Sequence, residues 1–186
     1  MRDEDTQKER ILVEKAKHDP AAFAELYDLY FPKVFCYVSW RVGNRSDTED
    51  LVADIFLAVL REIRSFKHHK DAAFSSWLFR IAYNKVVDYH RTRRQRDDLS
   101  LHDLPDIPDV SILPADDLDR RLLFKELYQM IQELPERQQE VVTMRFFAGM
   151  KNKEIAKALG ISERSVASSL CRGLQSLHAK FSKGKQ

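Results

Sequence analysis

The sequence predicts an all-α protein of two small helical domains, on three observations. Apolar residues recur at intervals of three and four along most of the chain, without the sustained alternation that strands show. The 186 residues include only five glycines. The stretch from 97 to 117 holds three of the six prolines among several aspartates, so it cannot continue a helix. We therefore expect one domain over 1–96, an acidic linker over 97–117, and a second domain over 118–186.

The first predicted helix lies in the segment HDPAAFAELYDLYF. Asp19 is placed as its N-cap and Pro20 as its first helical residue. Pro32 is expected to kink this helix or to make it restart. The residues predicted on its inward face are Phe23, Leu26, Tyr27 and Tyr30.

The next helix is predicted in RVGNRSDTEDLVADIFLAVLREI. Gly43 and Asn44 form a stop signal before it, and Ser46 and Glu49 stand in the register of a capping box. Its apolar stripe consists of Leu51, Val52, Ile55, Phe56, Val59, Leu60 and Ile63.

A further helix is predicted from about Phe74 to Arg94, ending in the basic cluster HRTRRQR. The residues predicted to point inward are Phe74, Trp77, Leu78, Ile81 and Ala82.

The second domain is predicted to contain four helices that end in a helix-turn-helix. An amphipathic helix from Leu118 to Leu134 is followed by one with Pro135 in its first turn and Gly149 at its exit. Asn152 is expected to cap the third helix, Gly160 to end it in the left-handed conformation, and Ser162 to cap the fourth. The residues that suit the helix-turn-helix core are Ala156, Ile161, Val166 and Leu170.

Charge is distributed unevenly, although the net charge is only +2. Residues 1–96 carry +3, residues 97–126 carry −6 and residues 127–186 carry +5. Two basic blocks that flank an acidic strip suit two modules that face nucleic acid. No apolar run approaches the length of a membrane span, and the polar N-terminus does not suit a signal peptide, so we expect a cytoplasmic protein.

The last predicted helix offers a candidate surface for duplex DNA. Lys153 on the preceding helix suits contact with the DNA backbone. The outward residues that suit contacts with base edges and phosphates in a major groove are Arg164, Ser165, Ser168, Ser169 and Arg172. An ordinary solvated helix face is the alternative.

The helix near residues 74–94 offers a candidate surface for unpaired bases. Arg80, Asn84, Asp88 and Arg91 fall near one another at three- and four-residue spacing. A mixed polar stripe is often only solvated surface. The arginines that follow, Arg94 among them, together with nearby tyrosines, favour contact with phosphates and bases taken out of a duplex.

Three blocks of this sequence resemble the signature blocks of bacterial RNA polymerase sigma factors, specifically the extracytoplasmic-function (ECF) group of the sigma-70 family. They are SDTEDLVADIFLAVLREIRSF, FSSWLFRIAYNKVVDYHRTRR and LPERQQEVVTMRFFAGMKNKEIAKALGISERSVASSLCRGLQSL. The resemblance covers roughly residues 20–96 and 120–180. It implies a factor that binds core RNA polymerase, recognises and melts promoter DNA, and initiates transcription.

The resemblance also implies roles for particular positions. Asp50, Leu51, Asp54 and Phe56 match the surface that docks on the clamp helices of the polymerase largest subunit, and the flap of the second largest subunit is a further expected contact. Phe66 and Lys67 belong to the loop over 65–73 that captures a base flipped from the minus-ten element. Arg80 and Asn84 match positions around that pocket, and we assign Asp88, Arg91 and Arg94 of the same polar and basic stretch to the minus-ten surface with them. The helix-turn-helix corresponds to the part that binds the minus-35 element.

The family further implies an anti-sigma factor as a partner, which would hold this chain at the membrane if it were itself anchored there. The family implies no cofactor, no metal and no covalent chemistry. This sequence departs from the common pattern at Ala167 and Ser169, where Lys and Arg are usual, and at Gly173, where Ala is usual. The loss of cations predicts weaker anchoring to phosphates.

Three alternatives remain open from the residues alone. One is a stand-alone regulator that binds a DNA palindrome as a dimer, and another is an anti-sigma factor or adaptor that binds polymerase without directing it. The third is a metal-dependent nuclease that uses carboxylates and histidines, although no motif with catalytic spacing supports it. Its candidate residues are His68, His69, Asp71, Asp50 and Asp54. The two cysteines, Cys36 and Cys171, are expected to be packing or surface residues.

Overall fold

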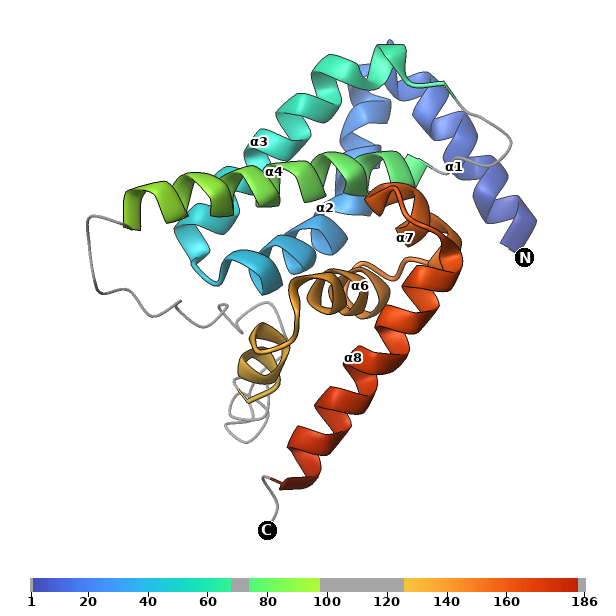
Figure 1. Ribbon diagram of the computed structural model, residues 1–186. Helices are drawn as coiled ribbons and strands as arrows, with labels where there is room; N and C mark the ends of the chain where they lie inside the picture. The colour runs from blue at the N-terminus through green and yellow to red at the C-terminus, as the bar shows by residue number, and fades with distance from the viewer. Residues whose placement is uncertain (1, 68–73, 98–125, 184–186) are drawn as a thin grey trace, which may run out of the picture.

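The computed structural model describes residues 2–67, 74–97 and 126–183, and every regular element in these ranges is a helix. The helices form two groups, α1 to α4 and α6 to α8, which pack directly against each other (Figure 1). The prediction of an all-α fold is confirmed. The predicted linker, the loop with His68 and His69, and the first part of the helix predicted from Leu118 lie outside the described residues.

The first helix, α1 (Arg2–Ala16), was not predicted, because the opening residues are nearly all polar or charged and give no apolar period. It packs against α2, with Val13 and Ala16 buried between them.

Helix α2 (Pro20–Val42) begins as predicted. The Asp19 carboxylate accepts a hydrogen bond from the backbone N–H of Ala21 at 2.9 Å, and Pro20 is the first helical residue. The predicted restart at Pro32 is wrong, because the helix continues through it. Buried residues on the far side of the proline, such as Val34 and Val38, extend the apolar face, and their packing outweighs the lost backbone hydrogen bond.

Helix α3 (Arg45–Glu62) is capped by Asn44, whose side chain accepts from the N–H of Asp47 at 3.0 Å. The predicted capping box is therefore wrong: Ser46 lies inside the helix, and Glu49 pairs with Arg45 at 2.8 Å instead. Gly43 ends α2 just before it in the left-handed conformation, with φ of 79°. A 3-10 turn, η1 (Ile63–Ser65), follows α3 and leads toward α4 (Phe74–Asp97).

The second group contains a helical segment over 126–132, then α6 (Glu136–Phe146), α7 (Asn152–Leu159) and α8 (Glu163–Lys183). The predicted helix-turn-helix is formed by α7 and α8. Gly160 ends α7 with φ of 66°, and the Ser162 hydroxyl accepts from the N–H of Ser165 at 3.1 Å, both as predicted. Lys151 rather than Asn152 is the N-cap of α7, because the helix already begins at Asn152.

The larger of two apolar clusters among the described residues runs through both groups, and a smaller one joins Trp40 of α2 to Tyr128, Ile131, Leu134 and Val142. Buried residues of α2, α3 and α4 are continuous with Val141, Met144, Ile155 and Val166 of the second group. The two groups correspond to the two predicted domains, but their cores are joined. The boundaries at 96 and 118 stay a prediction.

Gly173 lies buried where α8 crosses α6. A Cβ atom at this position would lie 3.0 Å from Cγ2 of Val142 and 3.6 Å from Cβ of Gln138. The close approach of the two helices therefore explains why glycine stands where the family commonly has alanine.

We predict that the effect of Gly173→Ala depends on Val142. Alanine in a helix interior stabilises the folded state by about 1 kcal/mol relative to glycine. When Val142 is present, the steric contact between its Cγ2 and the new Cβ offsets this stabilisation. In a Val142→Ala background the same change is expected to stabilise the protein by more, by roughly 1 kcal/mol. Urea denaturation of the four proteins measures this coupling, and equal effects in both backgrounds would contradict the packing explanation.

Candidate nucleic-acid interface

A surface pocket lies at the start of α4, and we call it the α4 pocket. Both helical groups contribute to it, because Lys157 comes from α7. The residues that line it are Ser65, Phe66, Lys67, Ser76, Trp77, Arg80 and Lys157. It therefore brings together three of the residues predicted to bind the minus-ten element, namely Phe66, Lys67 and Arg80.

Phe66 has a different place from the one expected of a base-capturing side chain. It is only 6% exposed and packs against Phe74, with ring centroids 5.5 Å apart, and against Trp77 at 5.0 Å. In this structure Phe66 belongs to the apolar cluster beneath the pocket and also lines it, and its role in binding the minus-ten element stays a prediction. Lys67 and Arg80 remain exposed at its edge.

Ser76 was not singled out from the sequence, yet it is the most unusual group in the α4 pocket. It is 5% exposed, and its hydroxyl has no hydrogen-bond partner within the described structure. Buried polar groups are nearly always hydrogen-bonded, so an unpaired one that lines a pocket suggests a ligand contact. A serine beside a tryptophan gives no periodic signal that would have revealed this.

The polar stripe predicted on α4 is present. Arg80, Asn84, Asp88 and Arg91 are all exposed, and Asp88 forms an ion pair with Arg91 at 2.9 Å. The side chain of Arg94 lies outside the described residues.

Tyr89 and Arg93, on the other side of this helix end, hold α4 against α3. The Tyr89 hydroxyl donates to Oδ2 of Asp47 at 2.6 Å and accepts from the Arg93 guanidinium at 2.9 Å. Burial, followed by the hydrogen bond to Asp47, raises the pKa of Tyr89 to about 12, so it stays a donor at neutral pH. Both side chains therefore contribute to the packing of α4 on α3.

The predicted polymerase-binding residues on α3 divide into two kinds. Asp50 and Asp54 are exposed and Leu51 is half-buried, whereas Phe56 is 7% exposed and packs on Tyr27 with ring centroids 4.5 Å apart. Phe56 is a core residue, as its place in the predicted apolar stripe indicates, and its role in binding polymerase stays a prediction. Leu57 and Leu60 are about half exposed on the same helix, and the sequence had placed Leu60 inside.

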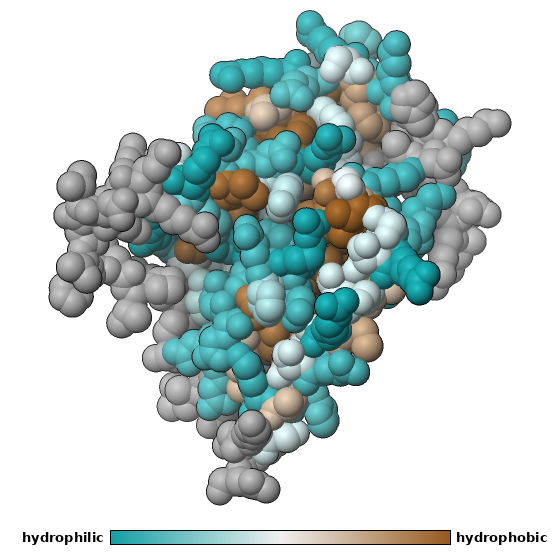
Figure 2. Space-filling model, viewed as in Figure 1, coloured by the Kyte–Doolittle hydropathy of each residue, from teal (hydrophilic) through white to brown (hydrophobic). Residues whose placement is uncertain are grey.

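The predicted minus-35 residues lie on the first turns of α8 and on α7. Arg164, Ser165, Arg172 and Lys153 are exposed, while Ser168 and Ser169 are half-buried. The Arg172 guanidinium donates to the Ser168 hydroxyl at 2.7 Å. Figure 2 shows that the face of the molecule seen in Figure 1 is mainly hydrophilic and carries separate apolar patches rather than one continuous apolar surface.

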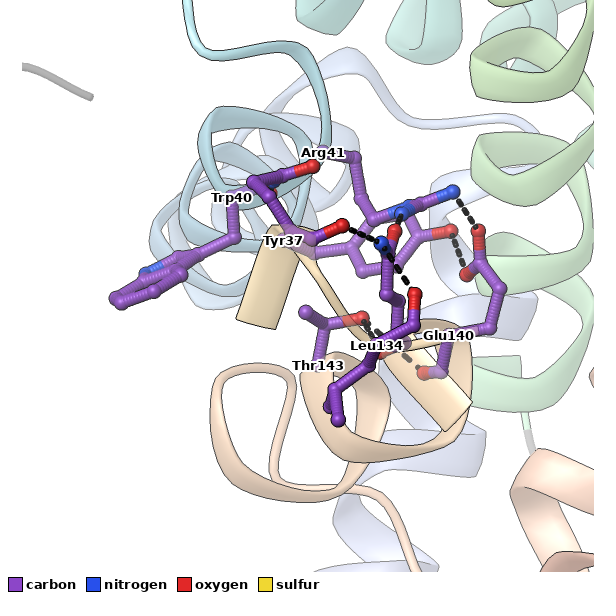
Figure 3. A network of polar contacts seen from close by, with 8 residues as sticks. Tyr37, Trp40, Arg41, Leu134, Glu140 and Thr143 are labelled. Carbon is purple, nitrogen blue, oxygen red and sulfur yellow. Dashed lines mark hydrogen bonds and ion pairs between the residues drawn. The ribbon is translucent and has the colours of Figure 1, made fainter. Parts of the chain in front are cut away.

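A polar cluster that the sequence did not reveal joins the two helical groups (Figure 3). The Tyr37 hydroxyl donates to Oε2 of Glu140 at 2.8 Å, and the Arg41 guanidinium pairs with Oε1 at 2.8 Å. Arg41 also donates to Gln139. Glu140 is 2% exposed and Arg41 5%, and burial raises the pKa of the Glu140 carboxyl while the Arg41 charge opposes that rise.

Within residues 2–67, 74–97 and 126–183, no helix is long and apolar enough to span a bilayer, and no three metal-ligating side chains lie close enough together to hold a metal ion. His68, His69 and Asp71, which the nuclease alternative requires, lie outside those ranges.

The fold and these surfaces define a helical DNA-binding protein with a helix-turn-helix, and comparisons with known proteins specify its family. Residues 26–96 match Sigma-70 region 2, and residues 124–177 match Sigma-70, region 4. The ECF RNA polymerase sigma factor SigX of Bacillus subtilis is 30% identical over 159 residues, which cover 83% of this chain and 81% of SigX. The ECF sigma factor BldN of Streptomyces coelicolor is 33% identical, over 94% of this chain but only 66% of BldN.

The solved structure of CnrH in complex with the cytosolic domain of CnrY has the same fold, with a TM-score of 0.73 at 23% identity, over 94% of this chain and 97% of that one. The chain belongs to the ECF sigma factors of the sigma-70 family. Its function is that of the family: it binds core RNA polymerase, recognises promoter DNA and directs transcription initiation. Sigma factors are initiation factors rather than catalysts, which argues against the nuclease alternative.

Proposed function

We propose that this ECF sigma factor divides promoter recognition between two surfaces. The α4 pocket and the stripe through Arg80 and Asn84 bind and open the minus-ten element, and the first turns of α8 bind the minus-35 element as duplex. The observation that carries the proposal is the α4 pocket itself, because it combines exposed cations with a buried hydroxyl that lacks a partner.

The chemistry of the α4 pocket suits an extruded base. Trp77 is half-buried and offers an aromatic wall, Lys67 and Arg80 suit the flanking phosphates, and Ser76 offers a hydrogen bond to a base edge. Flipping a base costs a few kcal/mol, and a pocket that binds only the extruded base offsets this cost and selects sequence at the same time.

The surface on α8 suits selection more than tight binding. Arg164 and Arg172 are its exposed cations, Ser165 is exposed beside them, and Ser168 and Ser169 are half-buried. Each missing phosphate contact lowers the salt dependence of binding by about one unit of slope. Core polymerase and the α4 surface supply the remaining affinity, because the two surfaces are linked in one chain.

Two protein partners follow from the proposal. Asp50, Leu51 and Asp54, with the exposed Leu57 and Leu60 beside them, would dock on the clamp helices of core polymerase, and the second helical group would dock on the flap. An anti-sigma factor is the other partner, since CnrH was solved with CnrY and the RpoE of Bartonella quintana with the anti-sigma factor NepR. We place the chain in the cytoplasm with its polymerase, held at the membrane only if that anti-sigma factor is anchored there.

The proposal is tested by run-off transcription with purified core polymerase and DNA from upstream of the gene for this protein. Stimulated initiation at a defined start site is expected. No stimulation, together with no co-elution of the chain with core polymerase, would refute it. Tight binding to a palindrome without polymerase would favour the stand-alone regulator instead.

We predict that Asn84→Ala and Arg172→Ala act on different steps. Asn84→Ala is expected to impair opening of the promoter with little effect on the closed complex. Arg172→Ala is expected to weaken the closed complex and to lower the salt slope of its formation by about one. Permanganate footprinting measures opening and gel shift measures the closed complex, with Arg10→Ala on α1 as the control. Equal loss of the closed complex in both variants, with normal opening, would contradict this division.

We also predict that Ser76→Ala changes stability and DNA binding in opposite directions. Removal of an unpaired buried hydroxyl is expected to stabilise the free protein by about 1 kcal/mol, while opening of the promoter is reduced because the base loses a hydrogen bond. Thermal unfolding and footprinting measure the two effects. Ser46→Ala, at an exposed serine near the start of α3, controls for the general gain of alanine in a helix.

A further inference from the structure

Three cations of the α4 pocket have no partner in the described part of the chain. Lys67 and Arg80 are exposed at its edge, and Lys157 of α7 is half-buried and lines it from the second helical group. Within residues 2–67, 74–97 and 126–183, none of these three side chains forms a hydrogen bond or an ion pair. Several unpaired cations around one pocket produce a local positive potential that attracts anions.

The first turn of α4 adds to this positive potential. Ser76 and Trp77 lie in the N-terminal turn of a 24-residue helix, where the helix dipole favours negative charge. Helix α7 packs along the same turns (Figure 1), and its Glu154 carboxylate accepts from the Ser75 hydroxyl at 3.1 Å. Glu154 does not line the pocket, and the described residues that do line it include no carboxylate.

Ser76 is a further group in the α4 pocket that lacks a partner. Its side chain is 5% exposed, and its hydroxyl has no hydrogen-bond partner within the described structure. A hydroxyl both donates and accepts hydrogen bonds, so it can pair with a phosphate oxygen or with a polar ligand atom. A ligand in the pocket would remove the free-energy cost of leaving this buried group unpaired.

The size and the aromatic wall of the pocket limit the ligand. Its volume is about 360 Å³, near the lower end of the range of about 300 to 1,000 Å³ that is typical of small-molecule sites. This suits one nucleotide rather than two. Trp77 forms the aromatic wall and is supported by Phe66 and Phe74, with ring centroids 5.0 and 5.5 Å away. An aromatic face of this kind can stack on any base.

The number of cations favours a free nucleotide over a nucleotide within a DNA strand. A phosphodiester in a strand carries a single negative charge. A terminal phosphate carries a charge of about −1.5 to −2 at neutral pH and has three acceptor oxygens. Three unpaired cations from two helical groups therefore match a terminal phosphate better than a diester.

We propose that the α4 pocket is a binding site for a free mononucleotide, whose terminal phosphate is held by Lys67, Arg80 and Lys157. The base stacks on Trp77, and the Ser76 hydroxyl gives the ligand a further hydrogen bond. Because Lys157 belongs to the second helical group, the phosphate contacts both groups. The site requires no contact with a promoter, so it goes beyond the proposed function, although both use the same pocket.

Isothermal titration calorimetry of the full chain tests the site, with each of the four ribonucleoside 5′-monophosphates in a buffer of low ionic strength that contains no phosphate. We expect at least one of them to bind about tenfold more tightly than inorganic phosphate and than its own nucleoside, because the pocket contacts both parts of the ligand. The matching dinucleoside monophosphate, in which the phosphate is a diester, is expected to bind less tightly by a similar factor.

Lys157→Gln is expected to weaken binding of the nucleotide by about tenfold, because it removes one charge-assisted hydrogen bond. Lys151→Gln is the matched control, since Lys151 is an exposed cation at the start of the same helix and does not line the pocket. It is expected to bind the nucleotide as the unaltered protein does. Ser76→Ala is a second variant that keeps the charge of the pocket, and it is expected to weaken binding roughly fivefold.

The mononucleotide site is refuted if no monophosphate binds, if inorganic phosphate or the dinucleoside monophosphate binds as tightly, or if Lys157→Gln leaves the affinity unchanged. The proposed function stands after any of these results if the unaltered protein directs run-off transcription with core polymerase. Conversely, the proposed function fails and the mononucleotide site stands if the expected affinities are measured but no transcription is stimulated.

Discussion

The orientation of α6 on α2 depends on one buried carboxylate. Apolar packing attracts helices to one another without fixing their direction, whereas a buried charge must meet its partners at particular distances and angles. Glu140 meets Tyr37 and Arg41, which lie one helical turn apart near the end of α2. This fixes α6 on α2, and because α7 follows α6 after a short connection, it also determines which part of α4 the helix-turn-helix covers.

The parts of this structure that the sequence predicted are those governed by neighbouring residues. Asp19, Gly160 and Ser162 perform the capping roles expected of them, because each acts on a backbone within a few positions of itself. The Tyr37–Glu140 bond joins residues 103 positions apart, and no local pattern marks such a pair. Phe56 and Phe66 show a second limit of prediction from sequence. A family motif indicates which positions belong to a functional region, but it does not indicate whether a side chain at such a position is exposed or buried.

One departure from the family pattern has a physical explanation in the packing. Gly173 lets α8 approach Val142 of α6 closely, so the position is constrained by the neighbouring helix rather than by DNA. The serines on the outward face of α8 are partly engaged within the helix, since Ser168 accepts from Arg172 and Ser165 meets the Ser162 cap. A phosphate that binds Arg172 would replace the exposed hydrogen bond from Arg172 to Ser168. Loss of an exposed polar contact costs little free energy, so these local contacts are compatible with DNA binding.

The cations around the α4 pocket disfavour the packing of the two helical groups against each other, whereas the Glu140 cluster favours it. The packing of α7 on α4 places Lys157 in the same pocket as Lys67 and Arg80. Like charges that line one pocket repel one another. Glu154, one turn before Lys157, offsets only part of this repulsion. Salt screens repulsion between exposed charges much more than it screens a buried pair. Higher ionic strength therefore weakens the repulsion among these three cations more than it weakens the attraction between Arg41 and Glu140.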